Sequence, residues 1–241
     1  EKPDGYTLLV TATQHVIYPA LQPHLPYDPK KDFSNIAILA LAPNVLLVPA
    51  QSPVNNVKEF VDYARKQPDG LAFGSSGVGG SAHLSGELFK LVSGANLRHI
   101  PYKGAAPAAT DLIGAQIPSA FLDATSASSF IHSGKAKALA VTSKQPLPSL
   151  PSVPTIAESG YPSYESQAWV GLFGPPGLPT EIITKLNQIA LQANTKEENI
   201  KWLSDNNSVT VKLSPQQVTS FIHSELDKWQ QVVNEAHVTA Q

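Results

Sequence analysis

The sequence of 241 residues contains no cysteine and no methionine. Without cysteine there can be no disulfide, no thiolate catalysis and no cysteine-ligated metal centre. This absence leaves the compartment open, because cytoplasmic and envelope proteins can both do without cysteine. The absence of methionine means that Glu1 is not a translation start. We therefore expect a preceding segment, such as a signal peptide.

Charged residues and long apolar runs are also scarce. Charged residues make up 15% of the chain and the formal net charge is -2, so a basic surface for nucleic acid is missing and we expect no nucleic-acid partner. The most apolar window, residues 36–50, is interrupted by Pro43 and is shorter than the roughly 20 residues that span a bilayer. The 42% of apolar residues suffice for a core in one large or two small domains.

Strand and helix patterns alternate through the middle of the chain. Residues 57–64 carry apolar side chains at helical spacing, and Pro68-Asp69-Gly70 ends that helix. The next helix has Ser81 as its expected N-cap and Gly94 as its stop. The alternation predicts an α/β fold with a parallel sheet and helical crossovers. The further predicted strands are 45–48, 71–73, 97–100, 117–122, 138–142 and 169–173, with helices over 107–113 and 126–132.

The last part of the chain is predicted to be helical. Its final helix begins with a capping box in which Ser214 is the N-cap and Gln217 the third helical residue. Trp169, Trp202 and Trp229 are interpreted as packing residues.

Ligands of open parallel sheets bind at the carboxyl ends of the strands. In this sequence that rule selects the loops 11–14, 74–81, 101–104 and 123–125, which are rich in glycine and hydroxyl groups and have Lys103 as their only basic residue. An anion bound there would be held mainly by backbone N–H and hydroxyl donors. The histidines show no spacing typical of a metal site, so we expect no metal.

The segment from Gly74 to Leu84, GSSGVGGSAHL, has three interpretations. It lacks the Gly-Lys-Ser/Thr ending of a P-loop, and its match to a dinucleotide fingerprint has no acidic residue after the following strand. A nucleophile elbow needs G-x-S-x-G, but Gly77 comes one residue too early for it. A serine hydrolase using Ser75 or Ser76 nevertheless stays an alternative.

The third interpretation is an anion site at the start of a helix. Unpaired N–H groups and the helix dipole attract an anion such as a carboxylate, and Ser75, Ser76 and Ser81 add hydroxyl donors. Alternatively, the serines only cap the helix and the glycines only turn the chain. Asp123 likewise either orients a ligand or caps the helix that follows it. Tyr102 and Lys103 either line a cleft or lie in solvent.

Seven motifs occur in the order of a known family and extend over nearly the whole chain. They are Pro3-Asp4-Gly5-Tyr6-Thr7-Leu8-Leu9, Leu25-Pro26-Tyr27-Asp28-Pro29 with Asp32-Phe33, SSGVGGSAHL, His99-Ile100-Pro101-Tyr102-Lys103-Gly104, Leu139-Ala140-Val141-Thr142-Ser143, Val153-Pro154-Thr155-Ile156-Ala157-Glu158-Ser159-Gly160 and residues 169–179 (WVGLFGPPGLP). The chain resembles the Bug, or tripartite tricarboxylate transporter (TctC-type), extracytoplasmic solute-binding proteins.

The resemblance implies a type II periplasmic binding protein fold, with two α/β lobes, a central cleft and parallel-rich sheets flanked by helices. Lobe one would comprise residues 1–44 and 168–241, and lobe two residues 45–167. The implied protein is an exported, periplasmic, monomeric receptor without catalysis or cofactor. It would bind a small organic carboxylate by lobe closure and deliver it to the membrane permease subunits of a tripartite tricarboxylate-type transporter.

In this family two loops, one from each lobe, grip a ligand carboxylate, and SSGVGGS matches the loop of lobe two. The family's N-terminal segment, which supplies the other loop, is absent before Pro3, so we expect a longer protein. A further alternative is a cytoplasmic effector-sensing domain of a transcription regulator. The predicted ligand-binding residues are Thr11, Thr13, Ser75, Ser76, Gly77, Val78, Gly79, Gly80, Ser81, His83, Tyr102, Lys103, Asp123 and Thr125.

Overall fold

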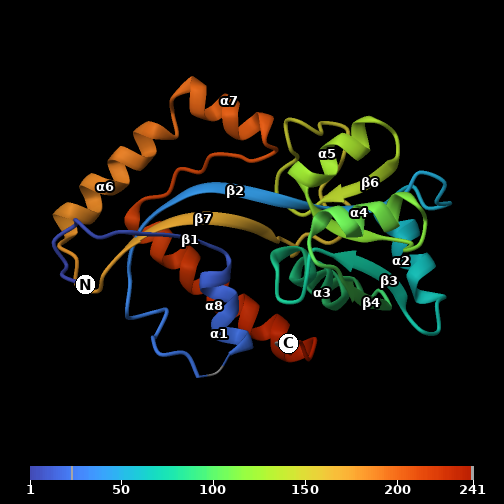
Figure 1. The fold of residues 1–241 in the computed structure, drawn as a ribbon, viewed down its shortest axis with the longest axis horizontal. Coiled ribbons are helices and arrows are strands. Elements are labelled where there is room, and N and C mark those ends of the chain that lie inside the picture. Colours follow the sequence, from blue (N-terminus) through green and yellow to red (C-terminus); the bar gives the residue numbers. More distant parts are fainter. Residues whose placement is uncertain (23, 240–241) are drawn as a thin grey trace. The chain divides into compact units, whose positions relative to one another are not determined.

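The computed structural model describes residues 1–22 and 24–239, which form two compact units (Figure 1). Unit 1 comprises Glu1–Leu41 and the chain from Ala168 onward, and unit 2 comprises Ala42–Gln167. The chain passes from one unit to the other within β2 (Ser34–Pro49) and at the start of β7 (Gln167–Gly174). No helix among the described residues combines the length and the apolar composition that a membrane span needs.

Unit 1 is built on the first half of β2, on β7 and on the short strand β1 (Leu9–Ala12). β1 runs antiparallel to β7, with Leu9 opposite Phe173. The chain forms α1 (Gln14–Leu21) directly after β1, and this helix lies against the long C-terminal helix α8 (Pro215–Glu235) (Figure 1). The remaining helices are α6 (Thr180–Ala193) and α7 (Glu197–Asp205).

The helical tail was predicted correctly in its main features. The capping box is present: Ser214 Oγ accepts the Gln217 N–H, and the Gln217 side chain accepts the Ser214 N–H. Trp169 and Trp229 are buried, as expected of packing residues. The same expectation is wrong for Trp202, whose side chain is 64% exposed because α7 lies on the surface and buries none of its residues.

Unit 2 contains a five-stranded mixed sheet. β3 (Leu71–Ser75) runs parallel to its neighbours β4 (Leu97–Pro101) and β5 (Ala120–Asp123). The second half of β2 lies antiparallel between β5 and β6 (Ala136–Val141). The α/β prediction is therefore confirmed, with parallel crossovers from β3 through β6. The expectation of a parallel sheet does not hold for β2, which is inserted antiparallel between two strands that follow it in sequence.

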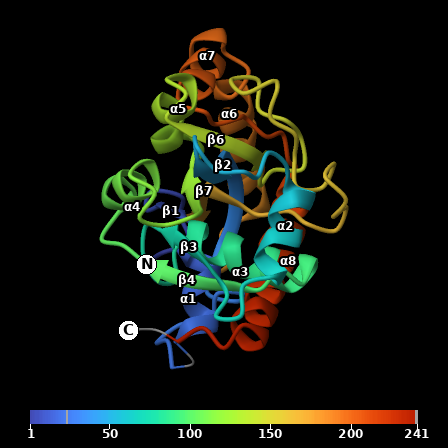
Figure 2. The same cartoon turned by 90° about the vertical axis from the view of Figure 1, so that its right-hand side faces the viewer.

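Helices cover both faces of this sheet (Figure 2). α2 (Val57–Arg65) and α3 (Ser81–Ser93) pack on one face, and α4 (Ala105–Ile113) and α5 (Ala124–His132) lie on the other. The predicted stripe of α2 is buried from Val57 to Ala64 against Phe73 and Phe89. Gly94 ends α3 in a left-handed conformation, as expected. The N-cap of α3 is Gly80 and not Ser81, so Ser81 is the first residue of the helix.

Candidate functional site

The glycine-rich segment lies at the carboxyl end of β3, where the loop 76–80 leads into α3. The Tyr102 N–H donates to the Ser75 carbonyl and the Gly104 N–H donates to the Ser76 carbonyl, at 3.0 and 3.2 Å. β5, which ends at Asp123, is the other neighbour of β3. Unit 2 therefore brings three of the predicted loops to one edge of its sheet, as the rule for open sheets requires.

Glycine is needed at several positions of this segment. The φ angles of Gly77 and Gly79 are 141° and 72°, which L side chains rarely adopt. A Cβ atom at Gly74 would lie 2.5 Å from Ile117 Cδ1. The glycines thus allow a backbone path that lets the loop approach its neighbours closely.

The N–H groups of the loop fall into two sets. The Gly77 N–H donates to Ser75 Oγ at 3.2 Å, and the Gly79 N–H donates to His83 Nδ1 at 3.1 Å. Within residues 1–22 and 24–239, the N–H groups of Val78 and Gly80 make no hydrogen bond of normal length and angle, although the Gly80 N–H faces the Gly77 carbonyl across a turn. The amides that remain for an anion are therefore those of Val78 and Gly80, together with the first turn of α3.

The three serines of the segment differ in accessibility. Ser76 is exposed, and Ser81 is half-buried and accepts a hydrogen bond of 3.4 Å from Asn44 Nδ2. Ser75 is fully buried, and its Oγ lies 2.6 Å from His99 Nε2 and 3.1 Å from the Gly77 carbonyl oxygen. The Ser75 hydroxyl therefore holds the loop through internal hydrogen bonds, and its role as a ligand residue stays a prediction.

Two histidines lie beneath the loop. The rings of His83 and His99 stack with centroids 3.6 Å apart, and Phe73 contacts both rings. Burial, with a smaller contribution from His83, lowers the pKa of His99 to about 3, so His99 is neutral near neutral pH. His83, a predicted ligand residue, is buried and uses its Nδ1 atom to accept from Gly79.

Glu87 completes this buried cluster. Its Oε1 atom lies 3.7 Å from His83 Nε2, and its Oε2 atom lies 3.4 Å from Lys90 Nζ. Burial alone would raise the pKa of Glu87, but the hydrogen bond from His83 and the positive charge of Lys90 outweigh burial and lower it. The cluster was not predicted from sequence.

The neighbouring loops place their polar side chains in structural roles. The Tyr102 hydroxyl donates to Asp111 Oδ2 at 2.8 Å, and burial together with Asp111 raises the pKa of Tyr102 to about 12. Asp123 caps α5, because its Oδ1 accepts the Ser126 N–H at 2.8 Å. This confirms the capping interpretation. Lys103 and Thr125 are exposed.

The remaining predicted residues belong to unit 1. Thr11 lies in β1, opposite Gly171 of β7. Thr13 is buried, and its Oγ1 accepts the Trp169 N–H at 2.8 Å. The Thr13 hydroxyl therefore ties the start of α1 to β7.

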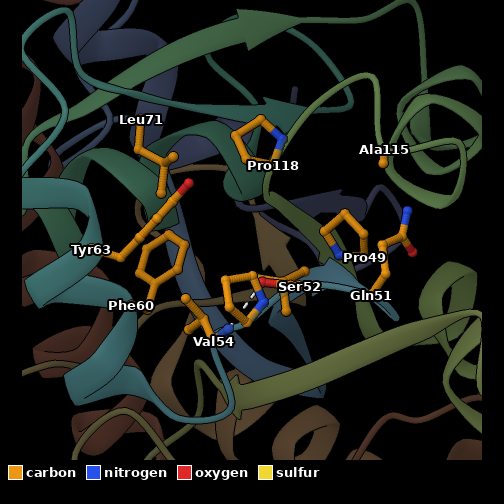
Figure 3. A pocket seen from close by; sticks show the side chains of 11 residues that line it. Pro49, Gln51, Ser52, Val54, Phe60, Tyr63, Leu71, Ala115 and Pro118 are labelled. Carbon is orange, nitrogen blue, oxygen red and sulfur yellow. Dashed lines mark hydrogen bonds between the residues drawn. The ribbon is translucent and has the colours of Figure 1, made fainter.

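A separate pocket of about 250 Å³ opens in unit 2 at the amino end of β3 (Figure 3). Phe60 and Tyr63 lie on one side of it, and Pro49 and Pro118 on the other. Its lining is mainly apolar and has no charged side chain. The described residues also contain no cluster of side chains that could hold a metal ion.

Comparison with known proteins identifies the chain's relatives. Residues 1–238 match the family model described as the tripartite tricarboxylate transporter family receptor, TctC. A UPF0065 protein encoded in the tcbD-tcbE intergenic region of Pseudomonas sp. strain P51 is 33% identical over 98% of this chain and 71% of its own length. Protein BugT of Bordetella pertussis is 30% identical over 96% of this chain and 72% of its own length.

Solved structures of similar proteins include two with bound ligands. Rpa4515 of Rhodopseudomonas palustris, solved with adipate, is 32% identical with a TM-score of 0.81, over 99% of this chain and 80% of that one. MatC of the same species, solved with malate, is 30% identical with a TM-score of 0.76, over 97% of this chain and 81% of that one.

These relatives decide between the receptor and the serine hydrolase that the sequence left open. The family is one of solute-binding receptors and not of enzymes, so the hydrolase alternative is wrong. The burial of Ser75 agrees with this, because a nucleophile must be reachable by its substrate. The chain belongs to the TctC family of tripartite tricarboxylate transporter receptors, the periplasmic solute-binding proteins that include the Bug proteins.

Proposed function

We propose that this chain is a periplasmic receptor that binds one carboxylate of a small organic anion on the loop 76–80 and the first turn of α3. The single observation that carries the proposal is the pair of unpartnered N–H groups at Val78 and Gly80, directly before a helix of 13 residues. Such a helix start carries the positive end of the dipole and its own unpaired amides. The exposed Ser76 hydroxyl adds a donor.

The ligand class is inferred from the relatives. Two similar proteins were solved with adipate and with malate, which are both dicarboxylates. A planar carboxylate has two acceptor oxygens and suits paired amide and hydroxyl donors. The exposed Lys103, after β4, is available for longer-range attraction of the anion. Thr11, Thr13 and Thr125 stay predictions as ligand residues.

We further propose that the protein is exported and hands its ligand to the permease subunits of a tripartite tricarboxylate-type transporter. This part rests on the family of receptors to which the chain belongs. Binding without chemical conversion of the ligand is what a receptor of this kind performs.

A thermal-shift series with adipate, malate and a monocarboxylate tests the proposal. A ligand at one hundred times its Kd stabilises a protein by about 2.7 kcal/mol, which is readily detected. The neutral alcohols that correspond to adipate and malate, hexane-1,6-diol and butane-1,2,4-triol, are the matched controls and should give no shift. Absence of a shift with any carboxylate would contradict the proposal.

A further inference from the structure

The buried pair His83 and His99 engages the ligand loop at two separate points. His83 Nδ1 accepts the Gly79 N–H at 3.1 Å. His99 Nε2 lies 2.6 Å from Ser75 Oγ, which in turn accepts the Gly77 N–H at 3.2 Å. The two glycine amides that point toward the protein are therefore the two that the histidines reach, directly or through Ser75.

The proton positions follow from these contacts. Because His83 Nδ1 accepts from an amide, it carries no proton, and the ring proton of His83 is on Nε2, on the side of Glu87. Ser75 Oγ has a single proton to donate, either to His99 Nε2 or to the Gly77 carbonyl. In both arrangements Ser75 Oγ can still accept the Gly77 N–H.

The stacked rings make these two contacts rigid. The ring centroids are 3.6 Å apart with an interplanar angle of 18°, and Phe73 packs against both rings from β3. His83 comes from α3 and His99 from β4, so the pair links the helix that follows the loop to the strand that pairs with β3. A side chain fixed in this way can hold a backbone group in one direction.

We propose that His83 and His99 are positioning residues for ligand binding: they hold the Gly77 and Gly79 amides inward, which leaves the Val78 and Gly80 amides directed to the anion. This inference rests on the proposed function. It explains why two buried histidines lie under a loop that is otherwise built of glycine and serine. Neither imidazole contacts the ligand.

Two reciprocal pairs of variants test the inference. The Asn carboxamide oxygen is bonded to Cγ, as His Nδ1 is, whereas the Gln carboxamide lies one carbon further out, near the position of His Nε2. His83→Asn and His99→Gln should therefore retain the contacts to the loop, whereas His83→Gln and His99→Asn should lose them. All four variants lose the stacked pair of imidazole rings. At each histidine, the variant that keeps the contact to the loop therefore shows the effect of losing the stack alone.

Calorimetric titration with adipate and malate gives the first measurement. We expect the dissociation constants of His83→Asn and His99→Gln to stay within about 3-fold of wild type. We expect those of His83→Gln and His99→Asn to rise by about 10-fold, which corresponds to about 1.4 kcal/mol, the size of one hydrogen bond. Equal affinities of the Asn and Gln variants at each histidine would overturn the inference, whether all four variants bind as wild type or all four bind weakly.

Amide hydrogen exchange gives a second measurement that needs no ligand. In the wild type and in His83→Asn, the Gly79 amide should exchange at least about 10-fold more slowly than those of Val78 and Gly80, because only Gly79 has an internal acceptor. In His83→Gln this protection should disappear. If the wild type binds neither adipate nor malate, the proposed function fails and exchange alone decides the positioning role. Equal exchange at all three amides in the wild type would overturn it.

Discussion

Replacement of Gly86 by alanine should destabilise unit 2, although alanine is the better helix former. Gly86 is buried within α3, and a Cβ atom there would lie 2.3 Å from Phe73 Cε2 and 2.6 Å from Phe73 Cζ. An ordinary contact between carbon atoms is about 3.5 to 4.0 Å, so the ring or the helix must move by at least about 1 Å. Phe73 is fully buried against Phe121 and His99, which leaves its ring no free direction.

The magnitude of this effect combines two opposing contributions. Alanine gains about 1 kcal/mol over glycine in a helix interior, and overpacking a core costs typically about 1 to 3 kcal/mol. We take the upper part of that range, because the approach is so close, and expect Gly86→Ala to lower the free energy of unfolding by about 1 to 2 kcal/mol. Since the tryptophans belong to unit 1, unit 2 is best followed by amide hydrogen exchange of β3 and α3.

The double variant Gly86→Ala with Phe73→Leu provides the control. Leucine removes the ring atoms that the new methyl group would contact, so the two substitutions together should cost less than the sum of the single ones, with a coupling of about 0.5 to 3 kcal/mol. A stabilised Gly86→Ala protein, or strict additivity in the double variant, would refute the reasoning from the contact distances.

Three further outcomes follow from individual contacts. Glu225 is buried and accepts the indole N–H groups of Trp169 and Trp229. Glu225→Ala should therefore lower the free energy of unfolding by about 2 to 4 kcal/mol, measured by urea titration with tryptophan fluorescence. The control Glu235→Ala changes an exposed residue of the same helix and should alter the free energy of unfolding little. Asp123→Ala should lower the free energy of unfolding by about 1 kcal/mol, because the N-cap of α5 is lost, and should leave the adipate affinity within about 2-fold. Asp123→Asn should preserve both the stability and the affinity. A large loss of affinity in Asp123→Asn would show instead that Asp123 binds the ligand. Burial lowers the pKa of His15 to about 4, so the unfolded chain takes up a proton at a higher pH than the folded protein does. The free energy of unfolding should therefore fall as the pH drops from about 6.5 toward 4, by up to about 3 kcal/mol. His15→Leu should flatten this pH dependence in urea titrations at several pH values, and an unchanged dependence would contradict the prediction.

The sequence allowed the local elements of unit 2 to be predicted well. The stripe at Val57, Phe60, Val61 and Ala64 has helical spacing, and all four side chains are buried. The strand ending at Ser75 and the helix after Gly80 follow from short-range signals, namely an apolar run, glycines and a hydroxyl. Elements of this kind are determined by neighbours along the chain.

Long strands and pairing partners were harder to predict. Residues 34–49 form one strand, although Pro43 suggested a break. Pro43 lies immediately before Asn44, where pairing with β5 begins, so its missing N–H does not interrupt that ladder. α1 was not predicted, and it contains Pro19, a residue that usually interrupts a helix.

The site was predicted in its position but not in its internal hydrogen bonds. Glycines and serines before a helix indicated an anion site, yet nothing local indicated that Ser75 is buried or that His83 accepts from Gly79. His99 reaches the loop because β4 pairs in parallel with β3 and places His99 beside Phe73. Such a register joins residues far apart in sequence and has no local signal.

The central claim, that the loop binds a carboxylate through its free amides, is tested most directly at Gly80. Its φ of -77° suits proline, and a Cβ atom there would have no neighbour closer than 3.7 Å. Gly80→Pro removes the N–H group, whereas Gly80→Ala adds a Cβ atom and keeps the N–H group. Calorimetric titration with adipate and malate should show about 10-fold weaker binding for Gly80→Pro and nearly unchanged binding for Gly80→Ala. Equal affinities of the two variants would contradict the account.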